Sequence, residues 1–530
     1  MKLKKMLRIS LILAALFSGS AMAKTFVYCS EGSPSAFNPQ VVADGTSINA
    51  SAMTVYNRLV EFKVGSTQLE PALAESWSVS KDRRTYTFQL RKGVKFHKTK
   101  YFTPKRDFNA DDVVFSINRM RVKDHRYHKV GGGTYEYFLG MGMNKLIKDV
   151  KKLNDYSVQI VLAAPEAPFL SNLAMPFMSI LSEEYSQYLA KNKKNEDIDF
   201  FPIGTGPFVY KKYIKDNLIR FTRNKNYWKA PAKVKNLVFA ITPDASVRFQ
   251  KLKAKECHLI THPAPTDLDA MKSNKKIKVV GEPGLNVGYL AMNVKKKPLD
   301  NAMVRKAIYH ALNKEAYIKA IYLGNAMEAV NPLPPSIWSY LKNPKAPAYD
   351  PAKSKALLKK AGLSKGIELE LWTLPVSRPY NPNGKKMGEM MKADLEKVGI
   401  KAKLVQYDWP TYLKKSQNGE HDLLQIGWTG DNGDPDNFLH TLLGCDAVID
   451  GSNYAKWCHK KYDELVIEAK RTDKQKQRAK LYEKAQKIFQ KELPWVPLAH
   501  AKVFRAMADN VKGYKIHPFG SDIFYDVDLK

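Results

Sequence analysis

The sequence predicts an α/β protein built from two bodies, and three observations lead to this prediction. The chain has 530 residues, enough for roughly two to four domain-sized units, and 44% of them are hydrophobic, which is ample for folded cores. Residues 367–407 read as strand, loop, helix and second strand, the pattern of an α/β unit. We expect the chain to cross between the bodies near residues 279–294 and to return near 499–504.

The first 23 residues have the pattern of a secretory signal peptide. Lysines and an arginine precede an apolar run at residues 9–17, and Ala21-Met22-Ala23 fits the small-x-small cleavage rule. The mature chain would then begin at Lys24 and be exported. No later apolar run of about 18 residues predicts a membrane-spanning helix.

The chain is strongly basic. Its formal net charge is +34, and removal of the four cations of the signal segment leaves +30. The lysines are scattered or form short runs, and no tract interleaves them densely with aromatic residues. This pattern favours a solvated, lysine-rich surface over a nucleic-acid groove. Long-range attraction to an anionic membrane face stays open.

Four cysteines, Cys29, Cys257, Cys445 and Cys458, remain in the mature chain. An even number in an exported protein favours two disulfides, although three pairings are possible. A pair between Cys445 and Cys458 would close a short loop and stabilise the fold by about 3 kcal/mol, and the other two would then tie distant parts of one body together. A metal site is the alternative, but no C-x-x-C spacing supports it.

The first body begins with a predicted strand over 25–29, and Gly45 and Thr46 precede a predicted helix over 49–59. Residues 67–200 then look like an inserted α+β subdomain.

Within this subdomain, residues 85–90 and 158–162 alternate between apolar and polar positions, as half-buried strands do. Asn109 is expected to cap a helix whose first turn carries two aspartates.

In the second body, a strand over 367–374 leads into the irregular loop V-S-R-P-Y-N-P-N-G, which contains Arg378. A helix follows, and its methionines are expected to face the core. A return strand over 401–407 and a short helix precede another strand, 421–428, which ends just before Asp431. The carboxyl ends of parallel strands lie on one side of a sheet, so Arg378 and Asp431 should leave the sheet on the same side.

The stretch Q-I-G-W-T-G-D-N-G-D-P-D-N-F at residues 425–438 combines glycines, aspartates and a proline, which is loop chemistry. Gly430 and Gly433 would let a ligand approach the backbone, and Asp431 follows Trp428, a large apolar wall. A tight surface turn with solvated aspartates is the alternative.

Arg378 and Asp431 are candidate receptors for the two ends of a zwitterion. A guanidinium matches a carboxylate bidentately, and an ionised aspartate suits an ammonium. Two extended residues span roughly 7 Å, so the separation of the two groups could set the length of a bound peptide. Alternatively, the two residues form a salt bridge with each other or with surface neighbours.

Enzymatic readings have less support. The chain lacks G-x-S-x-G, H-E-x-x-H, the phosphate-binding G-x-x-x-x-G-K-[ST] and C-x-x-C. Two histidine pairs have spacings that a metal could use, His125/His128 and His258/His262, but no acid or cysteine supports them. A carboxylate pair within Asp431, Asp434 and Asp436 has no partner for catalysis. The sequence therefore predicts a binding protein with no metal and no cofactor.

Several long segments resemble those of the periplasmic peptide-binding proteins of ABC importers, the peptide/nickel solute-binding family 5. They are V-Y-C-S-E-G-S-P at 27–34, Y-N-R-L-V-E-F at 56–62, N-A-D-D-V-V-F-S at 109–116, I-G-T-G-P-F at 203–208, I-T-P-D-A-S-V-R at 241–248, P-G-L-N-V-G-Y-L at 283–290, R-P-Y-N-P-N at 378–383 and G-W-T-G-D-N-G-D-P-D-N-F at 427–438.

The resemblance implies a two-lobed, type II periplasmic-binding-protein-like fold, hinged by two crossover strands. Lobe I would comprise residues 24–284, with the extra subdomain, and 502–530; lobe II would comprise 285–501. The implied function is capture of dipeptides in the periplasm by a monomer and delivery to the membrane permease of an ABC transporter, without nucleic acid.

The resemblance also implies the site. Asp431 would hold the peptide ammonium and Arg378 the carboxylate. The other implied cleft residues are Tyr380, Trp428, Thr429 and Gly430 from lobe II, with Gly45 and Thr46 opposing from lobe I. The implied disulfides are Cys29–Cys257 and Cys445–Cys458.

Two kinds of alternative stay open. One is a related binding protein for haem, glutathione, antimicrobial peptides or nickel, and Arg378 could also serve haem propionates. The other is a secreted hydrolase or a surface adhesin. The lysine-rich surface departs from the family pattern and leaves docking to the permease open.

Overall fold

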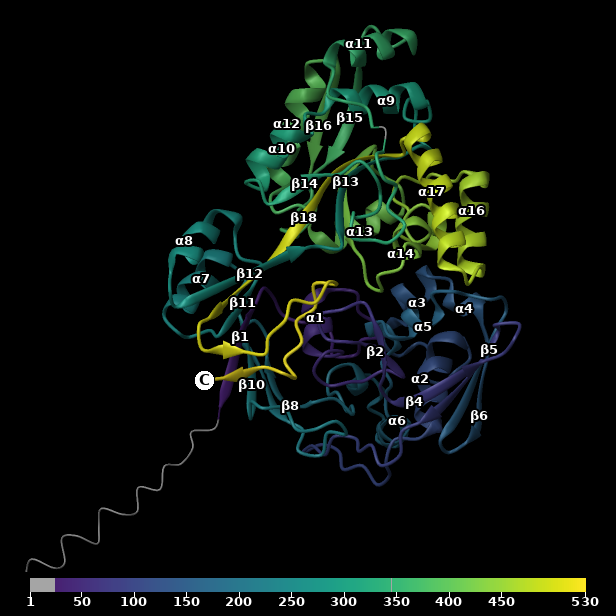
Figure 1. The fold of residues 1–530 in the computed structure, drawn as a ribbon, viewed down its shortest axis with the longest axis vertical. Helices are drawn as coiled ribbons and strands as arrows, with labels where there is room; N and C mark the ends of the chain where they lie inside the picture. The colour runs from purple at the N-terminus through teal and green to yellow at the C-terminus, as the bar shows by residue number, and fades with distance from the viewer. Residues whose placement is uncertain (1–23, 345) are drawn as a thin grey trace, which may run out of the picture.

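A computed structural model describes residues 24–344 and 346–530, and Figure 1 shows it as two bodies, one above the other. The predicted signal peptide, residues 1–23, lies outside the described residues. We call the lower body lobe I and the upper body lobe II. Among the described residues, no helix is both long and apolar enough to cross a membrane.

Lobe I contains a mixed sheet and an inserted subdomain. Its elements are β1 (Thr25–Ser30), α1 (Gly45–Ala50), β2 (Val60–Phe62), β3 (Leu69–Pro71), β4 (Ala74–Val79), β5 (Thr85–Leu90), α2 (Ala110–Arg121), η1 (Val130–Gly133), α3 (Glu136–Gly140), α4 (Met143–Leu146), β6 (Ile147–Asn154), β7 (Ser157–Leu162), α5 (Phe169–Leu173), η2 (Pro176–Met178), α6 (Glu183–Lys191), η3 (Asn195–Asp199), β8 (Phe208–Ile214), β9 (Leu218–Arg223), β10 (Asn236–Ile241), α7 (Ala245–Lys253), β11 (Leu259–Thr261), η4 (Pro265–Asp267), α8 (Leu268–Ser273), β12 (Ile277–Pro283), β19 (Val511–Lys512) and β20 (Asp528–Leu529).

Lobe II surrounds a second part of the sheet. Its elements are β13 (Asn286–Met292), α9 (Ala302–Ala311), α10 (Lys314–Ile321), β14 (Ala326–Glu328), α11 (Pro351–Lys360), β15 (Ile367–Trp372), α12 (Gly384–Glu396), β16 (Ile400–Val405), α13 (Trp409–Gln417), β17 (Leu423–Thr429), α14 (Asp436–Leu439), α15 (Ala447–Asp450), α16 (Lys460–Arg471) and α17 (Gln475–Glu492). The long strand β18 (Trp495–Ala508) is shared by both lobes.

The sheet order is β16-β15-β17-β13-β18-β11-β1-β10-β9-β8, with β12 and β14 also paired to β18. The first residues of β18 pair with β13 in lobe II, and its last residues pair with β11 and β12 in lobe I. The chain also passes between the lobes from β12 to β13. The predicted two-lobed α/β fold, with two crossing segments, is therefore confirmed.

The two segments that pass between the lobes are hydrogen-bonded to each other at one place. Gly284 N donates to the Ala501 carbonyl at 3.2 Å, and the Asn286 amide bonds to both the carbonyl and the N–H of Ala501 at 2.9 Å. A Cβ on Gly284 would lie 2.7 Å from the Ala501 carbonyl oxygen, so the close approach requires glycine.

Each lobe has its own hydrophobic core. The main core of lobe I is built around residues such as Phe26 and Phe239, whereas lobe II packs both faces of its sheet. β13 is buried throughout because alternate side chains enter the two cores of lobe II. Met387 and Met391 of α12 are fully buried there, which confirms their predicted core position.

The inserted subdomain contains the antiparallel sheet β4-β5-β7-β6, and both alternating segments predicted as strands are strands. Helix α2 begins after Asn109 with a capping box, as the sequence predicts.

The helix predicted over residues 49–59 is wrong. Helix α1 instead spans Gly45–Ala50, because the side chain of Asp44 accepts from Ser47 N and starts the helix earlier. The hydroxyls of Ser51 and Thr54 then bond to backbone carbonyls four residues back, and the chain continues as turns.

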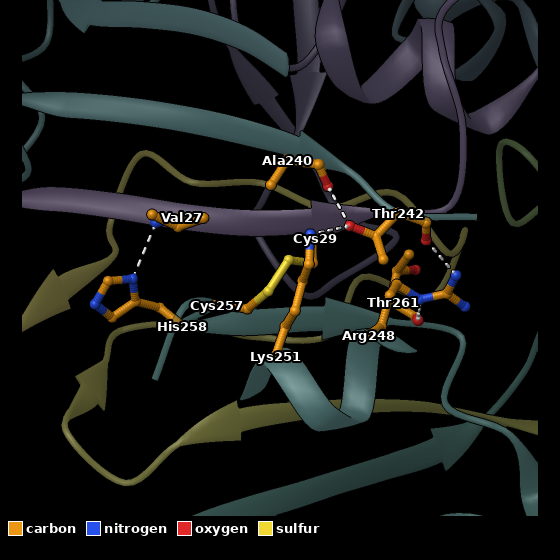
Figure 2. Close-up of a disulfide and its surroundings, with 9 residues drawn as sticks. All are labelled: Val27, Cys29, Ala240, Thr242, Arg248, Lys251, Cys257, His258 and Thr261. Carbon is orange, nitrogen blue, oxygen red and sulfur yellow. Dashed lines mark hydrogen bonds between the residues drawn. A yellow bond between two sulfur atoms is a disulfide. The ribbon is translucent and has the colours of Figure 1, made fainter. Parts of the chain in front are cut away.

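Both predicted disulfides are present. Cys29 in β1 bonds to Cys257, which lies two residues before β11, with 5.8 Å between the Cα atoms (Figure 2). Beside this bond, His258 Nδ1 accepts from Val27 N at 3.0 Å. Cys445 and Cys458 in lobe II are joined with 4.6 Å between their Cα atoms.

Candidate functional site

Two neighbouring strands of lobe II carry the central candidate residues. β15 and β17 run parallel, with Leu371 opposite Leu423 in register. Arg378 follows the end of β15 by six residues and Asp431 follows the end of β17 by two. Both therefore leave the same edge of the sheet, as the sequence predicts.

Arg378 has no ion pair among the described residues, so the alternative of a salt bridge to Asp431 or a surface acid is not seen. Its guanidinium carbon lies 5.1 Å from the ring centroid of Trp409. A tight turn holds the backbone, in which Arg378 and Asn381 exchange two hydrogen bonds at 3.1 and 3.0 Å. In lobe I, the pKa of His262 is well below its usual value, mainly because of burial, and Arg378 contributes to this lowering.

Tyr380 is buried two residues after Arg378. Its ring lies over Gly427, where a Cβ would meet the ring at 2.3 Å, and its carbonyl accepts from the Tyr322 hydroxyl at 2.6 Å. Burial raises the pKa of Tyr380, and Arg378 opposes this rise. The ring and the arginine are therefore neighbours in one wall of the site.

Asp431 has one oxygen that is satisfied and one that is not. Oδ1 accepts from the Tyr137 hydroxyl of lobe I at 3.4 Å, whereas Oδ2 is buried without a hydrogen-bond partner among the described residues. Burial raises the pKa of Asp431 to about 7, against the lowering effect of Tyr137 and Asn437. An unpartnered buried carboxylate oxygen is costly, so this group is suited to a cationic donor.

Asn437 holds the loop around Asp431. Its Oδ1 accepts from Asp431 N at 3.0 Å and from Trp428 Nε1 at 2.9 Å. Trp428 in turn meets Tyr137 edge to face, with the ring centroids 6.3 Å apart. The tryptophan is thus an apolar wall beside the carboxylate.

The other two predicted site residues of lobe II, Thr429 and Gly430, lie where β17 ends. Thr429 is half-buried and lies opposite Asn286 in the β13–β17 register. Gly430 N donates to the Leu285 carbonyl at 2.7 Å, and a Cβ on Gly430 would lie 2.6 Å from the ring of Phe438.

Gly45 and Thr46 form the first turn of α1 in lobe I. Gly45 is exposed, with open space where a Cβ would be, while Thr46 Oγ1 donates to Asp44 Oδ1 at 2.5 Å. The charge of Asp44 adds to the raised pKa of Tyr137, whose main cause is burial. This part of lobe I therefore neighbours the tyrosine that reaches Asp431, although among the described residues no hydrogen bond joins Gly45 or Thr46 to the predicted residues of lobe II.

Contacts that the sequence did not indicate join the two lobes beside Asp431, so the structure shows a closed form. The Asn432 amide of lobe II donates to Asn172 of lobe I at 2.7 Å. Lys470 Nζ lies 3.1 Å from Glu166 Oε1, and Ala167 N donates to the Lys470 carbonyl at 2.6 Å. Burial raises the pKa of Glu166 to about 7, although Lys470 lowers it. The buried Lys470–Glu166 pair bridges the lobes beside the loop that carries Asp431.

The histidine pairs considered as metal ligands have other partners. The ring nitrogen of His258 accepts from a backbone N–H, and His128 Nδ1 lies 2.9 Å from the Arg119 carbonyl oxygen. In the part of the chain that the structure describes, no three His, Cys, Asp or Glu side chains are grouped so that they could hold a metal ion.

A hinged pair of lobes, closed over strand-end loops that keep a guanidinium and a carboxylate oxygen free, defines a solute-binding protein. Residues 68–449 match the description "Bacterial extracellular solute-binding proteins, family 5 Middle", and the chain belongs to this family.

Individual relatives extend over nearly the whole chain. A dipeptide-binding protein of Escherichia coli K12 is 50% identical over 531 residues, which cover 100% of this chain and 99% of the relative. Heme-binding protein A of Haemophilus influenzae is 48% identical and covers 96% of this chain and 93% of its own. The crystal structure of a dipeptide-binding protein from Pseudoalteromonas sp. SM9913 in complex with Met-Leu is 39% identical, with a TM-score of 0.91 over 96% of this chain and 100% of that one.

Proposed function

We propose that this protein captures dipeptides between its lobes and delivers them to the permease of an ABC importer. The observation that carries the proposal is the free Oδ2 of Asp431, buried in a closed cleft on the same sheet edge as the unpaired Arg378. Two of the three relatives described above are dipeptide-binding proteins, which supports a peptide ligand. The third is a heme-binding protein, so the test includes both ligand classes.

Each end of a zwitterion would find its complement in this cleft. The peptide ammonium would donate to Asp431 Oδ2, which satisfies the buried carboxylate. The peptide carboxylate would accept two hydrogen bonds from the guanidinium of Arg378, which lies over the ring of Trp409. Tyr380 and Trp428 supply apolar walls that discriminate little between side chains.

Closure would complete the site from lobe I, with Tyr137, Gly45 and Thr46 on the opposite side of the peptide. Any ligand that drives closure must bind the closed state better than the open one. We place the hinge at the junction of Gly284, Asn286 and Ala501, with lobe I over residues 24–284 and 502–530 and lobe II over 285–501.

The chain would act as a monomer in the periplasm and bind the permease in its closed form. It would serve as a receptor without catalysis, since energy for uptake would come from the ATPase of the transporter. The permease and the monomeric state are testable by co-purification and by light scattering.

Calorimetry on the mature protein tests the proposal. The ligands are a free dipeptide, its N-acetyl and C-amide forms, a tripeptide, glutathione and haem. We expect tight binding of the free dipeptide alone, and a loss for both Asp431→Asn and Arg378→Met. Removing one partner of a buried charge pair costs about 2–5 kcal/mol, or at least roughly thirtyfold in Kd. Equal binding of the blocked peptides, or a preference for haem, would refute the charge-paired cleft.

A further inference from the structure

A groove of about 490 Å³ lies in lobe I at the outer edge of the central sheet. Loop 95–107, strands β8 and β9, and residues 224–226 line it, and β8 is the last strand of the sheet. In Figure 1, β8 and the nearby helix α6 lie low in lobe I, on the side away from lobe II. Seven of the lining residues are basic and only Asp107 is acidic: the cations are Lys95, Lys98, Lys105, Arg106, Lys211, Arg223 and Lys225.

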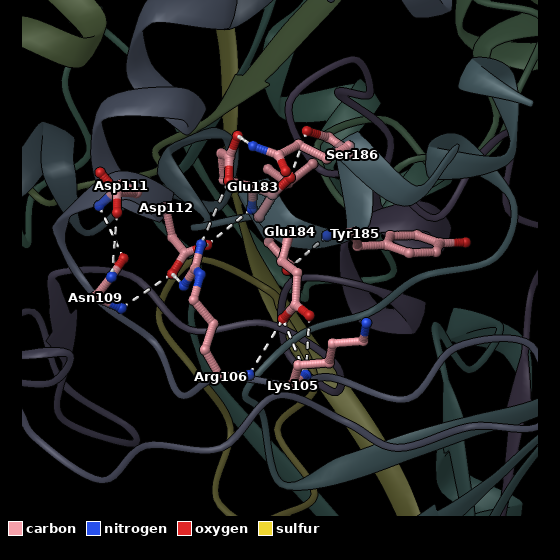
Figure 3. Close-up of polar contacts among 12 residues, drawn as sticks. Lys105, Arg106, Asn109, Asp111, Asp112, Glu183, Glu184, Tyr185 and Ser186 are labelled. Atoms are coloured by element: carbon pink, nitrogen blue, oxygen red, sulfur yellow. Dashed lines mark hydrogen bonds and ion pairs between the residues drawn. The ribbon is translucent and has the colours of Figure 1, made fainter. Parts of the chain in front are cut away.

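The acids around this groove already have partners. Arg106 forms a fork with both oxygens of Asp112 at 2.7 and 2.9 Å, and Glu184 accepts from the backbone N–H groups of Lys105 and Arg106 (Figure 3). Asp107 pairs with Lys95 at 3.1 Å. Glu184 holds loop 95–107 against α6 and Asp112 holds it against α2, and the ion pairs of Asp112 and Asp107 neutralise only two of the seven cations.

The other five cations have no ion pair among the described residues: Lys98, Lys105, Lys211, Arg223 and Lys225. In Figure 3, the Lys105 side chain extends away from the polar network. Arg223 Nε is also buried without a hydrogen-bond partner. Five like charges around one concave surface repel one another, so an anion at this position would be favourable.

Exposed aromatic side chains adjoin the groove. Tyr188, Phe200 and Phe201 are 43%, 51% and 40% exposed. Loop 95–107 connects them to the groove, because Tyr101 lies 5.5 Å from Phe201 and Phe102 lies 5.3 Å from Tyr188 between ring centroids. Between the aromatic residues in sequence lie three more exposed lysines that form no ion pair in the described part of the chain, Lys191, Lys193 and Lys194.

We propose that this basic–aromatic face, formed by the five unpaired groove cations, Lys191, Lys193, Lys194 and the three exposed aromatics, docks on an anionic phospholipid membrane. Cations close to an anionic bilayer each add roughly a fivefold gain in binding, and aromatic rings favour the headgroup level. A groove for a soluble anion would need the cations but not the exposed phenylalanines beside them. The face lies away from the cleft, so a docked protein could still open and bind its solute.

Vesicle sedimentation of the mature protein tests the proposal. The vesicles contain phosphatidylcholine with or without phosphatidylglycerol, at low and at physiological ionic strength. We expect binding only with phosphatidylglycerol, and weaker binding as salt screens the charges. The variant K98E/K211E/K225E should lose at least roughly tenfold in partitioning. The variant F200S/F201S should lose roughly threefold at unchanged net charge.

A matched control variant shows whether a loss of vesicle binding comes from the basic–aromatic face or from the change in net charge. The variant K355E/K359E/K360E makes the same change on α11, at the far end of lobe II, where these lysines are exposed and form no ion pair with any residue that the structure describes. We expect it to keep most of the vesicle binding. An equal loss in the control, no effect of F200S/F201S, or no binding by the unmodified protein would overturn the proposal. Unchanged melting temperatures of the variants establish that they fold, and none of these outcomes depends on the ligand of the cleft.

Discussion

Protonation of Asp431 should control how readily the lobes close without a ligand. In the closed structure, burial raises the pKa of Asp431 from its ordinary 3.8 to about 7. In an open form the carboxylate would meet water and titrate near its ordinary value. A difference of about three pKa units corresponds to about 4 kcal/mol, or roughly a thousandfold in the ratio of closed to open protein.

The sign follows from the direction of the shift. The pKa is raised in the closed state, so the charged carboxylate opposes closure. This penalty is complete above pH about 7, shrinks by about 1.4 kcal/mol per pH unit as the pH falls, and is absent below the ordinary pKa. A peptide ammonium would remove it at any pH by pairing with the carboxylate.

Asp431→Asn removes the charge and should therefore favour the closed form without ligand. Small-angle X-ray scattering of the unliganded protein measures the closed fraction through the radius of gyration. At pH 8 we expect the variant to be more compact than the wild type, and at pH 5 the difference in free energy should fall to about 2 kcal/mol. Glu166 also titrates near pH 7, but it is common to both proteins. Identical radii at pH 8 would refute the reasoning.

Three further perturbations test other parts of the structure. Lys470→Met leaves the buried Glu166 and Asp436 without their shared cation, so ligand dissociation measured by stopped flow should accelerate about a hundredfold, corresponding to about 3 kcal/mol. Replacing both Cys445 and Cys458 by serine should lower the free energy of unfolding by about 3 kcal/mol in urea titrations. Gly427→Ala would place a methyl group 2.3 Å from the Tyr380 ring and should weaken dipeptide binding by about 1–3 kcal/mol in calorimetry.

Each of these tests has its own control. Dissociation from the Lys470 variant is compared with the wild type at pH 8, above the raised pKa of Glu166, where the wild-type carboxylate is charged; equal rates would contradict the interlobe role. Adding reductant should leave the double-serine variant unchanged. For Gly427→Ala, unaltered affinity would mean that the position of Tyr380 does not matter for the ligand.

Local patterns were sufficient to predict much of lobe II. The strand before Asp431 and the strand before Arg378 each end in glycine- and proline-rich loops, and a parallel pair brings such ends together. The core position of the methionines of α12 follows from apolar periodicity alone.

The partners across the cleft could not be predicted from the sequence. Tyr137 is 294 residues from Asp431, and no repeat, spacing or motif marks it or the interlobe pair of Glu166 and Lys470. These contacts depend on how the lobes meet rather than on local sequence. The misplaced helix at residues 49–59 has a similar cause, because side-chain bonds of Asp44 and the following hydroxyls decided its start and end.

Arg378 and Asp431 both belong to lobe II, and this has a consequence for the order of events in selection. Rotation of one rigid body against the other about Gly284 and Ala501 leaves the spacing between these two groups constant. At the proposed dipeptide site, these two groups would therefore test the length of an incoming peptide while the protein is still open. A peptide that is too long should be rejected through fast escape from the open form, before lobe I takes part.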